Sequence, residues 1–379
     1  MAGYIFNLNS MDALKRIVQT GVYSTRFKQT NKKHWSVHHE GTFADFLSMR
    51  PGDNIYFFHK RKIYGVGELI SIDGDCIHLN YPAALSPQPE KDDYSLDKMI
   101  LNEAESDKNY RLLCTFEGSP NFFIKGVDMD EILKSNPSAF RILRAFWKLS
   151  FIKIDNLENR ALFDKIMKEN EEYIGSVDED SVFLFDKTIH QRILGLRTSN
   201  RGRYEVSSIP ILEAASSGDR IRHEMAVESA IIDSITNNLS NNIFGRWEYV
   251  SHQVIASPFK PIDYMDKIDI FGFRFIPGFE TVSKYLMIEI KKDKADIGVI
   301  GQSLKYVDWI EQEYCHDYSM IEAFIVARDF PDVVIAERNR AGKRFYTKGR
   351  PGRSHEWNGL RLIKYDYDKM NGILLFTEI

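Results

Sequence analysis

The chain has 379 residues and a formal net charge of −4 at pH 7, with 43% hydrophobic and 27% charged residues. This composition is typical of a soluble globular protein, and the length predicts two domains with a helical segment between them. Because the net charge gives the whole protein no attraction to nucleic acid, any contact with DNA must come from local basic patches.

Two further classes of protein are excluded by the residue pattern. No apolar run approaches the length of a membrane span, and the first residues lack the profile of a signal peptide. The three cysteines, Cys76, Cys114 and Cys315, are odd in number and widely separated, so they form neither a disulfide framework nor a zinc site. We therefore expect a cytoplasmic protein without a membrane partner.

Residues 1–130 predict a small β-rich domain with one or two helices. A helix begins at the N-cap residue Ser10 and ends at Gly21. Strand patterns follow at 54–59, 63–70 and 76–81, with further strands within 110–125. We expect these strands to close as a sheet or a barrel.

Several stretches of this part resemble the PUA-like group of domains that includes YTH and EVE domains, namely 20–25, Asn31, 52–58 and 64–69. Since those domains hold a modified base in an aromatic cage, the resemblance implies a small β-barrel with helices that reads such a base. Tyr23 corresponds to one wall of the cage, and Trp35 and Asn31 are further candidates for contact with the base. The alternative for aromatic side chains here, above all Phe57, is the barrel core.

The remaining chain divides into two parts. Residues 131–205 are rich in helical patterns and predict a connector. Residues 206–379 alternate helical and strand patterns, which is typical of an α/β unit with a mixed sheet. The expected strands are 247–254, 268–275, 285–291, 322–327 and 359–365.

An acidic residue interrupts the first helical pattern of this last part. Apolar residues recur at helical spacing through 221–239, and Glu228 lies within their stripe. A buried carboxylate is costly unless it is paired or bound to metal. Glu228 is therefore a candidate metal ligand or one half of a buried ion pair with an arginine. Glu224, one turn earlier, is the competing candidate.

Two predicted strands carry further charged residues that could belong to the same site. Asp269 points away from the isoleucines on either side of it, and Glu289 and Lys291 share a face on the later strand. If the strands are neighbours, these three side chains converge and can hold a divalent cation against a phosphodiester. The same spacing also fits an amphipathic hairpin with a solvated charged face.

The helical pattern after these strands places Gln302 and Tyr306 on one face. In chain order, the helix acid, Asp269, the Glu289-Ile290-Lys291 tripeptide and this pair resemble the PD-(D/E)xK nuclease superfamily, in particular its mismatch-type and anti-phage endonucleases. In many of its members the glutamine and tyrosine touch the catalytic lysine or the DNA backbone, and the resemblance implies the same role here.

The resemblance implies a restriction-endonuclease-like mixed sheet flanked by helices, with Mg²⁺ as cofactor and Mn²⁺ able to replace it. Asp269, Glu289 and the carbonyl of Ile290 would bind the metal, and Glu228 would bind a second metal or metal-bound water. Lys291 would orient or deprotonate the attacking water. Because cutting both strands needs two such sites, we expect a homodimer or a higher homo-oligomer.

A basic stretch at 338–353 is the main candidate for contact with DNA phosphates, and Arg344, Lys348 and Arg350 are its candidate residues. A solvated surface loop is an equally good interpretation of this stretch.

Taken together, the two resemblances imply a Mg²⁺-dependent DNA endonuclease whose N-terminal domain selects a methylated base, in modification-dependent restriction or anti-phage defence. One alternative is a repair nuclease that acts on mismatched, branched or single-stranded DNA. The other is a reader of modified nucleic acid without enzymatic activity.

Overall fold

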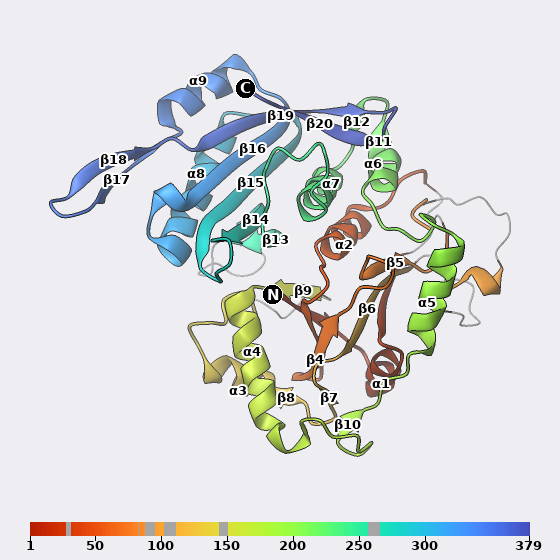
Figure 1. Ribbon diagram of the computed structural model, residues 1–379. Helices are drawn as coiled ribbons and strands as arrows, with labels where there is room; N and C mark the ends of the chain where they lie inside the picture. Colours follow the sequence, from red (N-terminus) through yellow and green to blue (C-terminus); the bar gives the residue numbers. More distant parts are fainter. Residues whose placement is uncertain (28–31, 83, 88–94, 102–110, 144–150, 257–265) are drawn as a thin grey trace. The chain divides into compact units, whose positions relative to one another are not determined.

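The computed structural model of the chain describes residues 1–27, 32–82, 84–87, 95–101, 111–143, 151–256 and 266–379. Asn31, one of the predicted base-binding residues, lies outside these ranges. The described chain is a mixed α/β structure with several sheets (Figure 1). It divides into two compact units: Met1–Lys33 with Met49–Val206, and His34–Ser48 with Ser207–Ile379.

The first unit is built on a mixed sheet that curls into a half-barrel. Its order is β2-β6-β4-β3-β1-β9, with β5 beside β6 and β8 beside β4. Only β1 and β3 of these described strands pair in parallel. The strands are β1 (Gly3–Asn7), β2 (Val22–Arg26), β3 (Asn54–His59), β4 (Lys62–Leu69), β5 (Ile77–Leu79), β6 (Arg111–Gly118), β8 (Val127–Asp128) and β9 (Phe151–Ile154).

Helix α1 (Met11–Thr20) has the ends that its sequence predicts. The Oγ atom of Ser10 accepts a hydrogen bond from the amide of Ala13 at 3.1 Å, which satisfies one of the free donors of the first turn. Gly21 ends the helix with φ of 63°, a left-handed conformation that a residue without Cβ adopts at little cost.

The predicted connector is part of the first unit. Ile132 of α3 (Met129–Ser135) and Leu162 and Ile166 of α4 (Asn156–Glu169) share one apolar core with Ile5 and Tyr56 from the sheet. Strand β9, which follows α3 in the chain, pairs with β1. Helix α5 (Thr188–Ser199) is also in this unit. Residues 131–205 therefore complete the first unit instead of forming a separate segment.

The second unit contains a six-stranded mixed sheet of order β13-β14-β15-β16-β19-β20. Strands β15, β16 and β19 run in parallel, and the other pairs are antiparallel. The strands are β13 (Tyr249–Ile255), β14 (Lys267–Phe275), β15 (Val282–Lys294), β16 (Ile321–Asp329), β19 (Leu360–Asp368) and β20 (Ile373–Glu378).

Two helices pack against the strands of this sheet. Helix α7 (Glu224–Thr236) contacts β13, β14 and β15, and α8 (Gly298–Ile310) contacts β15 and β16. The other described helices of the unit are α2 (Val37–Leu47), α6 (Ile209–Ala215) and α9 (Asp332–Ala341), and the short strands β11 (Ser216–Ser217) and β12 (Arg220–Ile221) precede α7. None of the described helices combines the length and the apolarity that crossing a bilayer requires.

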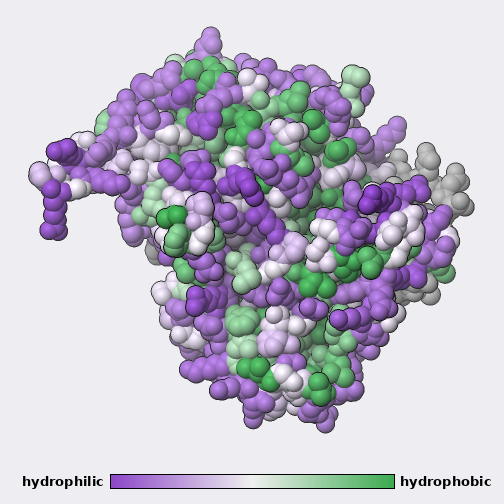
Figure 2. Space-filling model, viewed as in Figure 1, coloured by the Kyte–Doolittle hydropathy of each residue, from purple (hydrophilic) through white to green (hydrophobic). Residues whose placement is uncertain are grey.

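A two-stranded hairpin extends from the second unit as an arm, and its surface is largely hydrophilic (Figures 1 and 2). It consists of β17 (Arg344–Lys348) and β18 (Arg353–Trp357) and contains the later part of the basic stretch 338–353, whereas Arg338 and Arg340 lie on α9. Only Trp357 of these two strands is buried.

Helix α2 belongs to the second unit although its sequence lies between strands of the first. It packs along α7 (Figure 1), and its fully buried Glu40 lies 3.0 Å from the Nδ1 atom of His223, just before α7. The Oγ atom of Ser229 on α7 donates to the backbone carbonyl of Glu40 at 3.0 Å. The apolar residues Trp35 and Phe43 are fully buried here, with ring centroids 5.8 Å apart. Residues 34–48 are thus a structural part of the second unit.

This packing predicts that Phe43→Ala destabilises the protein by about 3–5 kcal/mol, because it leaves a cavity in place of a buried ring. Val37→Ala, at a position of the same helix that is 48% exposed, is the matched control and should change the free energy of unfolding by less than about 0.5 kcal/mol. Urea denaturation of the full chain measures both changes. Equal midpoints for the two variants would show that α2 is not packed as described.

Candidate active site

The three charged residues of the predicted nuclease motif lie on neighbouring strands. Strands β14 and β15 pair in a register that places Ile270 opposite Ile288. Asp269 and Glu289 are the next positions on the two strands, and opposite positions of an antiparallel pair share a face. The strand alternation read from the sequence therefore brings the two carboxylates together as expected.

Direct hydrogen bonds hold these side chains in place. The amide of Ile290 donates to Oδ2 of Asp269 at 2.7 Å, and the Nζ atom of Lys291 donates to Oε1 of Glu289 at 2.6 Å. The side chain of Glu289 is 1% exposed, whereas that of Lys291 is 25% exposed. The second oxygen of Glu289, Oε2, has no hydrogen-bond partner among the described residues. A buried oxygen of this kind is available to a ligand.

Helix α7 adds a third carboxylate to the cluster. Glu228 is 2% exposed, and its Oε1 accepts a hydrogen bond from Nε2 of Gln253 at 3.1 Å. The same nitrogen donates to Oδ1 of Asp269 at 3.2 Å, so one amide bridges the helix acid and the strand aspartate. The partners of Glu228 are this glutamine and His252, whose Nδ1 lies 3.6 Å from its Oε2, and not the arginine of the structural alternative.

The competing helix acid, Glu224, makes a different contact. Its Oε1 accepts from the backbone amide of Lys292 at 3.3 Å, and its charge acts on Glu289 and Lys291. Both helix acids therefore lie near the motif, but of the two, Glu228 is the one linked to Asp269 by a hydrogen-bonding side chain in the described structure.

Burial and the closeness of several carboxylates shift the pKa values of the site residues. Burial, followed by the charges of Glu228 and Glu289, raises the pKa of Asp269 well above its usual range. Burial also raises the pKa of Glu289, against the opposing effect of Lys291. For Lys291, burial favours a lower pKa, but Glu289, Asp269 and Glu224 outweigh it and the pKa rises. Carboxylates outnumber the cations that face them.

A divalent cation fits this imbalance. Across the described chain, no three His, Cys, Asp or Glu side chains are already arranged as a ligand set. The predicted set requires only two carboxylates, Asp269 and Glu289, with the carbonyl of Ile290. Carboxylate and carbonyl oxygens are the ligands that Mg²⁺ takes in proteins. The buried Oε2 of Glu289, which has no hydrogen bond within the described chain, is available to bind it, whereas Oε2 of Glu228 faces His252.

Helix α8 contributes the predicted glutamine–tyrosine pair. The Nε2 atom of Gln302 donates to the hydroxyl of Tyr306 at 3.0 Å, so the two side chains share a face. Burial raises the pKa of Tyr306 to about 12, and the charges of Glu289 and Asp269 act in the same direction. The tyrosine therefore lies close to the acidic cluster.

Two functional candidates on β13 were missed in the sequence. Gln253 lies opposite Asp269 in the register of β13 and β14, where it has φ of 52° and interrupts the ladder. A left-handed non-glycine residue inside a strand is uncommon, and such residues concentrate at functional sites. The signal was a run of polar residues, Ser251-His252-Gln253, within an apolar strand.

His252 connects this cluster to helix α2. Its Nε2 lies 2.6 Å from Oδ1 of Asp45, and its other nitrogen faces Glu228. Burial favours a lower pKa, but Asp45 and then Glu228 outweigh it and raise the pKa of His252 to about 10. No local sequence signal pointed to Asp45, because it lies far from the other site residues in the chain and beside the predicted reader residues.

The predicted phosphate-binding residues have different surroundings. Arg344 forms two hydrogen bonds with Asp308, at 2.6 and 2.7 Å, and Lys348 lies 2.8 Å from Asp317. Arg350, in the exposed turn of the β17–β18 hairpin, has no ion pair within the described chain. Of the three, Arg350 is the one whose charge is not already paired.

Tyr23 and Trp35, the two predicted aromatic residues of the cage, belong to different compact units. Tyr23 lies in the first unit, half-buried, with its ring 3.9 Å from that of Phe6 between centroids. Trp35 lies in the second unit and is fully buried beside Phe43 of α2. As a core residue of the other unit, Trp35 does not act as a cage wall in this structure. Phe57 is fully buried, as its core interpretation predicts.

Comparison with known proteins identifies no family. No protein-family model and no curated protein matches the chain. A solved repair endonuclease from Pyrococcus abyssi is 19% identical with a TM-score of 0.22, over 34% of this chain and 47% of its own. Proteins from Agrobacterium tumefaciens and Pseudomonas putida are 11% and 16% identical, with TM-scores of 0.24 and 0.25, over 45% and 43% of this chain and 92% and 98% of theirs.

The chain thus matches about half the length of the endonuclease. At these identities and TM-scores, the likenesses carry no argument about fold or function. The candidate site is therefore judged on its own geometry.

The raised pKa of His252 predicts a pH-dependent stability when metal is removed with EDTA. Its folded-state pKa of about 10 exceeds the value of about 6.5 in an unfolded chain. The stabilisation is therefore complete below pH 6.5 and is lost as the pH rises towards 10. Asp45→Asn removes the main cause of the shift, so its free energy of unfolding should depend less on pH over this window.

Urea denaturation at several values between pH 6.5 and 10 measures this difference. Asp12→Asn, at an exposed aspartate of α1, is the matched control and should keep the wild-type slope. A slope for Asp45→Asn equal to that of wild type would contradict the charged Asp45–His252 pair.

Proposed function

We propose that the second unit is a metal-dependent DNA endonuclease with the PD-(D/E)xK arrangement. The observation that carries this proposal is the placement of Asp269 and Glu289 at neighbouring positions of β14 and β15, with Lys291 against Glu289. A solvated hairpin would leave its charged face in water. Here Glu289 and Glu228 are almost fully buried, which is costly for a carboxylate without a function or a partner.

In this proposal, Asp269, Glu289 and the carbonyl of Ile290 hold Mg²⁺, and Glu228 is the ligand of a second ion or of metal-bound water. Mn²⁺ has the same preference for oxygen ligands and can take its place. Bound there, the cation supplies Lewis-acid activation of the phosphodiester and of the attacking water.

Lys291 has the properties of an electrostatic stabiliser. Because its pKa is raised, the side chain stays protonated near neutral pH. A protonated amine cannot take a proton from water, but it can donate a hydrogen bond to the phosphate and offset the negative charge of the transition state. This narrows the roles expected from the sequence to orientation and charge stabilisation.

Gln253 and Gln302 are positioning residues. Gln253 donates to Glu228 and to Asp269 and so holds two carboxylates that repel each other. Gln302 donates to Tyr306 and fixes the hydroxyl near the acidic cluster, where it can contact the DNA backbone. Each residue restricts the orientation of a group that acts on the substrate.

The central experiment is the cleavage of plasmid DNA by the full chain with Mg²⁺, with Mn²⁺ and with EDTA. We expect cleavage with either metal and none with EDTA. Asp269→Ala and Glu289→Ala should lower the rate by at least about 100-fold, because each removes a metal ligand. DNA binding should persist, since fewer carboxylates repel the phosphates. Glu378→Ala, at an exposed strand carboxylate, is the matched control.

Cleavage by Asp269→Ala at a rate near that of Glu378→Ala would reject the assignment of the site. A thermal melt of each variant separates loss of chemistry from loss of folding, because the proposal requires inactive variants that remain folded.

Modification-dependent restriction or anti-phage defence is the biological role that we propose for this nuclease, acting as a homodimer. Two active sites in one dimer account for cleavage of both strands. The selection of a methylated base by the first unit stays a prediction from the sequence, in which Tyr23 retains its assigned role. Repair of mismatched, branched or single-stranded DNA is the competing role.

Matched substrates distinguish these roles. We expect the full chain to cleave methylated duplex faster than its unmodified twin, and fully paired duplex no slower than mismatched duplex. Base stacking predicts a preference of about 1–3 kcal/mol in binding, which phosphate contacts cannot produce because they are blind to the base. The ratio of kcat/KM values measures it. Equal cleavage of both duplexes with faster cleavage of the mismatched one would favour repair.

A further inference from the structure

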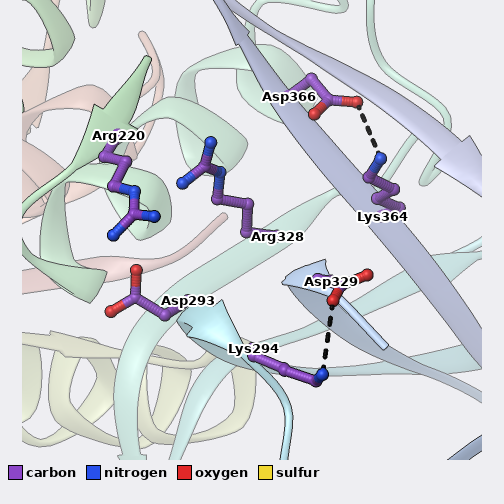
Figure 3. A pocket seen from close by; sticks show the side chains of 7 residues that line it. All are labelled: Arg220, Asp293, Lys294, Arg328, Asp329, Lys364 and Asp366. Atoms are coloured by element: carbon purple, nitrogen blue, oxygen red, sulfur yellow. Dashed lines mark ion pairs between the residues drawn. The ribbon is translucent and has the colours of Figure 1, made fainter. Parts of the chain in front are cut away.

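A charged pocket of about 500 Å³ lies in the second unit, outside the residues assigned above (Figure 3). It is formed where the parallel strands β15, β16 and β19 end, with β12 beside them. The carboxyl ends of neighbouring parallel strands are a common place for ligand sites, because the connections diverge there and leave an opening. Its position therefore resembles that of a binding site.

The lining of this pocket is entirely charged. Four cations, Arg220, Lys294, Arg328 and Lys364, face three aspartates, so the formal charge is +1. No aromatic or aliphatic residue is present in the described lining. A site of this composition can hold a phosphate and lacks the aromatic ring on which a base usually stacks.

The four cations of the pocket differ in their ion pairs. Lys294 lies 3.9 Å from Asp329, and Lys364 lies 3.6 Å from Asp366. Such exposed pairs contribute little and exchange readily with a stronger anion. Arg220 has no ion pair within the described chain, so its whole donor fork is available. The structure thus offers one unpaired guanidinium and two weakly held amines.

Arg328, the fourth cation of the pocket, is held in place by an ion pair. Its Nη2 atom lies 2.5 Å from the Asp219 carboxylate, beside β12, and the other guanidinium donors remain free of ion pairs. Arg328 and Arg220 lie on the same side of the pocket (Figure 3). Two guanidinium groups in one opening match the oxygens of a phosphate, which they can bind in a bidentate manner.

The pocket lies close to the candidate active site along one strand. Lys294 follows Lys291 by three residues on β15, which corresponds to about 10 Å. A duplex strand advances about 3.4 Å along its axis for each phosphate, so a strand with one phosphate at Lys291 has others within reach of the pocket. The site is therefore placed to hold the same strand.

We propose that this pocket binds a backbone phosphate of the nucleic-acid strand that the active site cleaves, and so sets the position of that strand without reading its sequence. The inference rests on the proposed nuclease function. A free nucleotide or inorganic phosphate shares the same chemistry, but the place of Lys294 three residues after Lys291 on β15 favours a phosphate within the strand at the active site.

The test uses Arg220→Gln in the full chain, because Arg220 has no ion pair whose loss would disturb the fold. Binding of a fluorescent duplex is measured in EDTA over a series of salt concentrations. We expect a several-fold loss of affinity for every sequence and a decrease of about 0.9 in the salt slope, the value for one lost phosphate contact. Arg220→Lys should restore most of the slope.

Cleavage with Mg²⁺ provides the second measurement. We expect Arg220→Gln to raise KM and to leave kcat close to that of wild type, because the residue binds the strand away from the reacting phosphate. Arg246→Gln is the matched control, since Arg246 is an exposed arginine of the same unit that lies outside both the pocket and the basic stretch 338–353.

Three results would separate the hypotheses. Wild-type cleavage together with equal salt slopes for Arg220→Gln and Arg246→Gln would overturn the pocket inference and leave the nuclease function intact. The absence of wild-type cleavage on every DNA would overturn the nuclease function, and with it the assignment of the pocket to a cleaved strand. Displacement of duplex by inorganic phosphate at an equal phosphate concentration would assign the pocket to the free anion instead.

Discussion

The repulsion among buried carboxylates is the constraint on which the second unit depends. Gln253 links Glu228 to Asp269, the charges of Glu228 and Glu289 act on Asp269, and Lys291 donates a hydrogen bond to one of the three, Glu289. Burial strengthens the repulsion between these carboxylates, so a fold that keeps them together needs nearby donors or cations that offset their negative charge. The surrounding structure supplies that compensation through donors that are themselves held in place: the Gln253 amide, the backbone amide of Ile290 and the charged imidazole of His252.

The compensation extends beyond the site to a helix from another part of the chain. Asp45 on α2 pairs with His252 and favours its charged form, and His252 in turn faces Glu228. A cation therefore lies between two carboxylates, one from α2 and one from the acidic cluster. The ion pair between Asp45 and His252 adds a directional contact to the apolar packing of α2. Apolar burial alone would fix the helix to α7, but it would not select the orientation that brings Asp45 to the histidine.

Local chemistry made some of these features predictable. The alternation around Asp269, Glu289 and Lys291 predicted both strands and the shared face, and the cap residues predicted the ends of α1. The boundary between the units was not predictable in this way, because the helical patterns after residue 130 do not show which core they complete. Trp35 was a candidate cage residue through the resemblance to PUA-like domains, whereas in the structure its buried ring packs on Phe43 of the helix that follows it. Gln253 required the register of two strands before its role was visible.

The insertion of residues 34–48 has a consequence for how the protein is made. The ribosome releases α2 early, but the strands and helix against which it packs are synthesised only after the whole first unit. The first unit can close during synthesis, since domains fold as their residues emerge. At that stage α2 is already present in the chain, but His223, which pairs with its Glu40, has not yet been synthesised. The two segments of the second unit are therefore synthesised at separate times, residues 34–48 before the rest of the first unit and residues 207–379 after it.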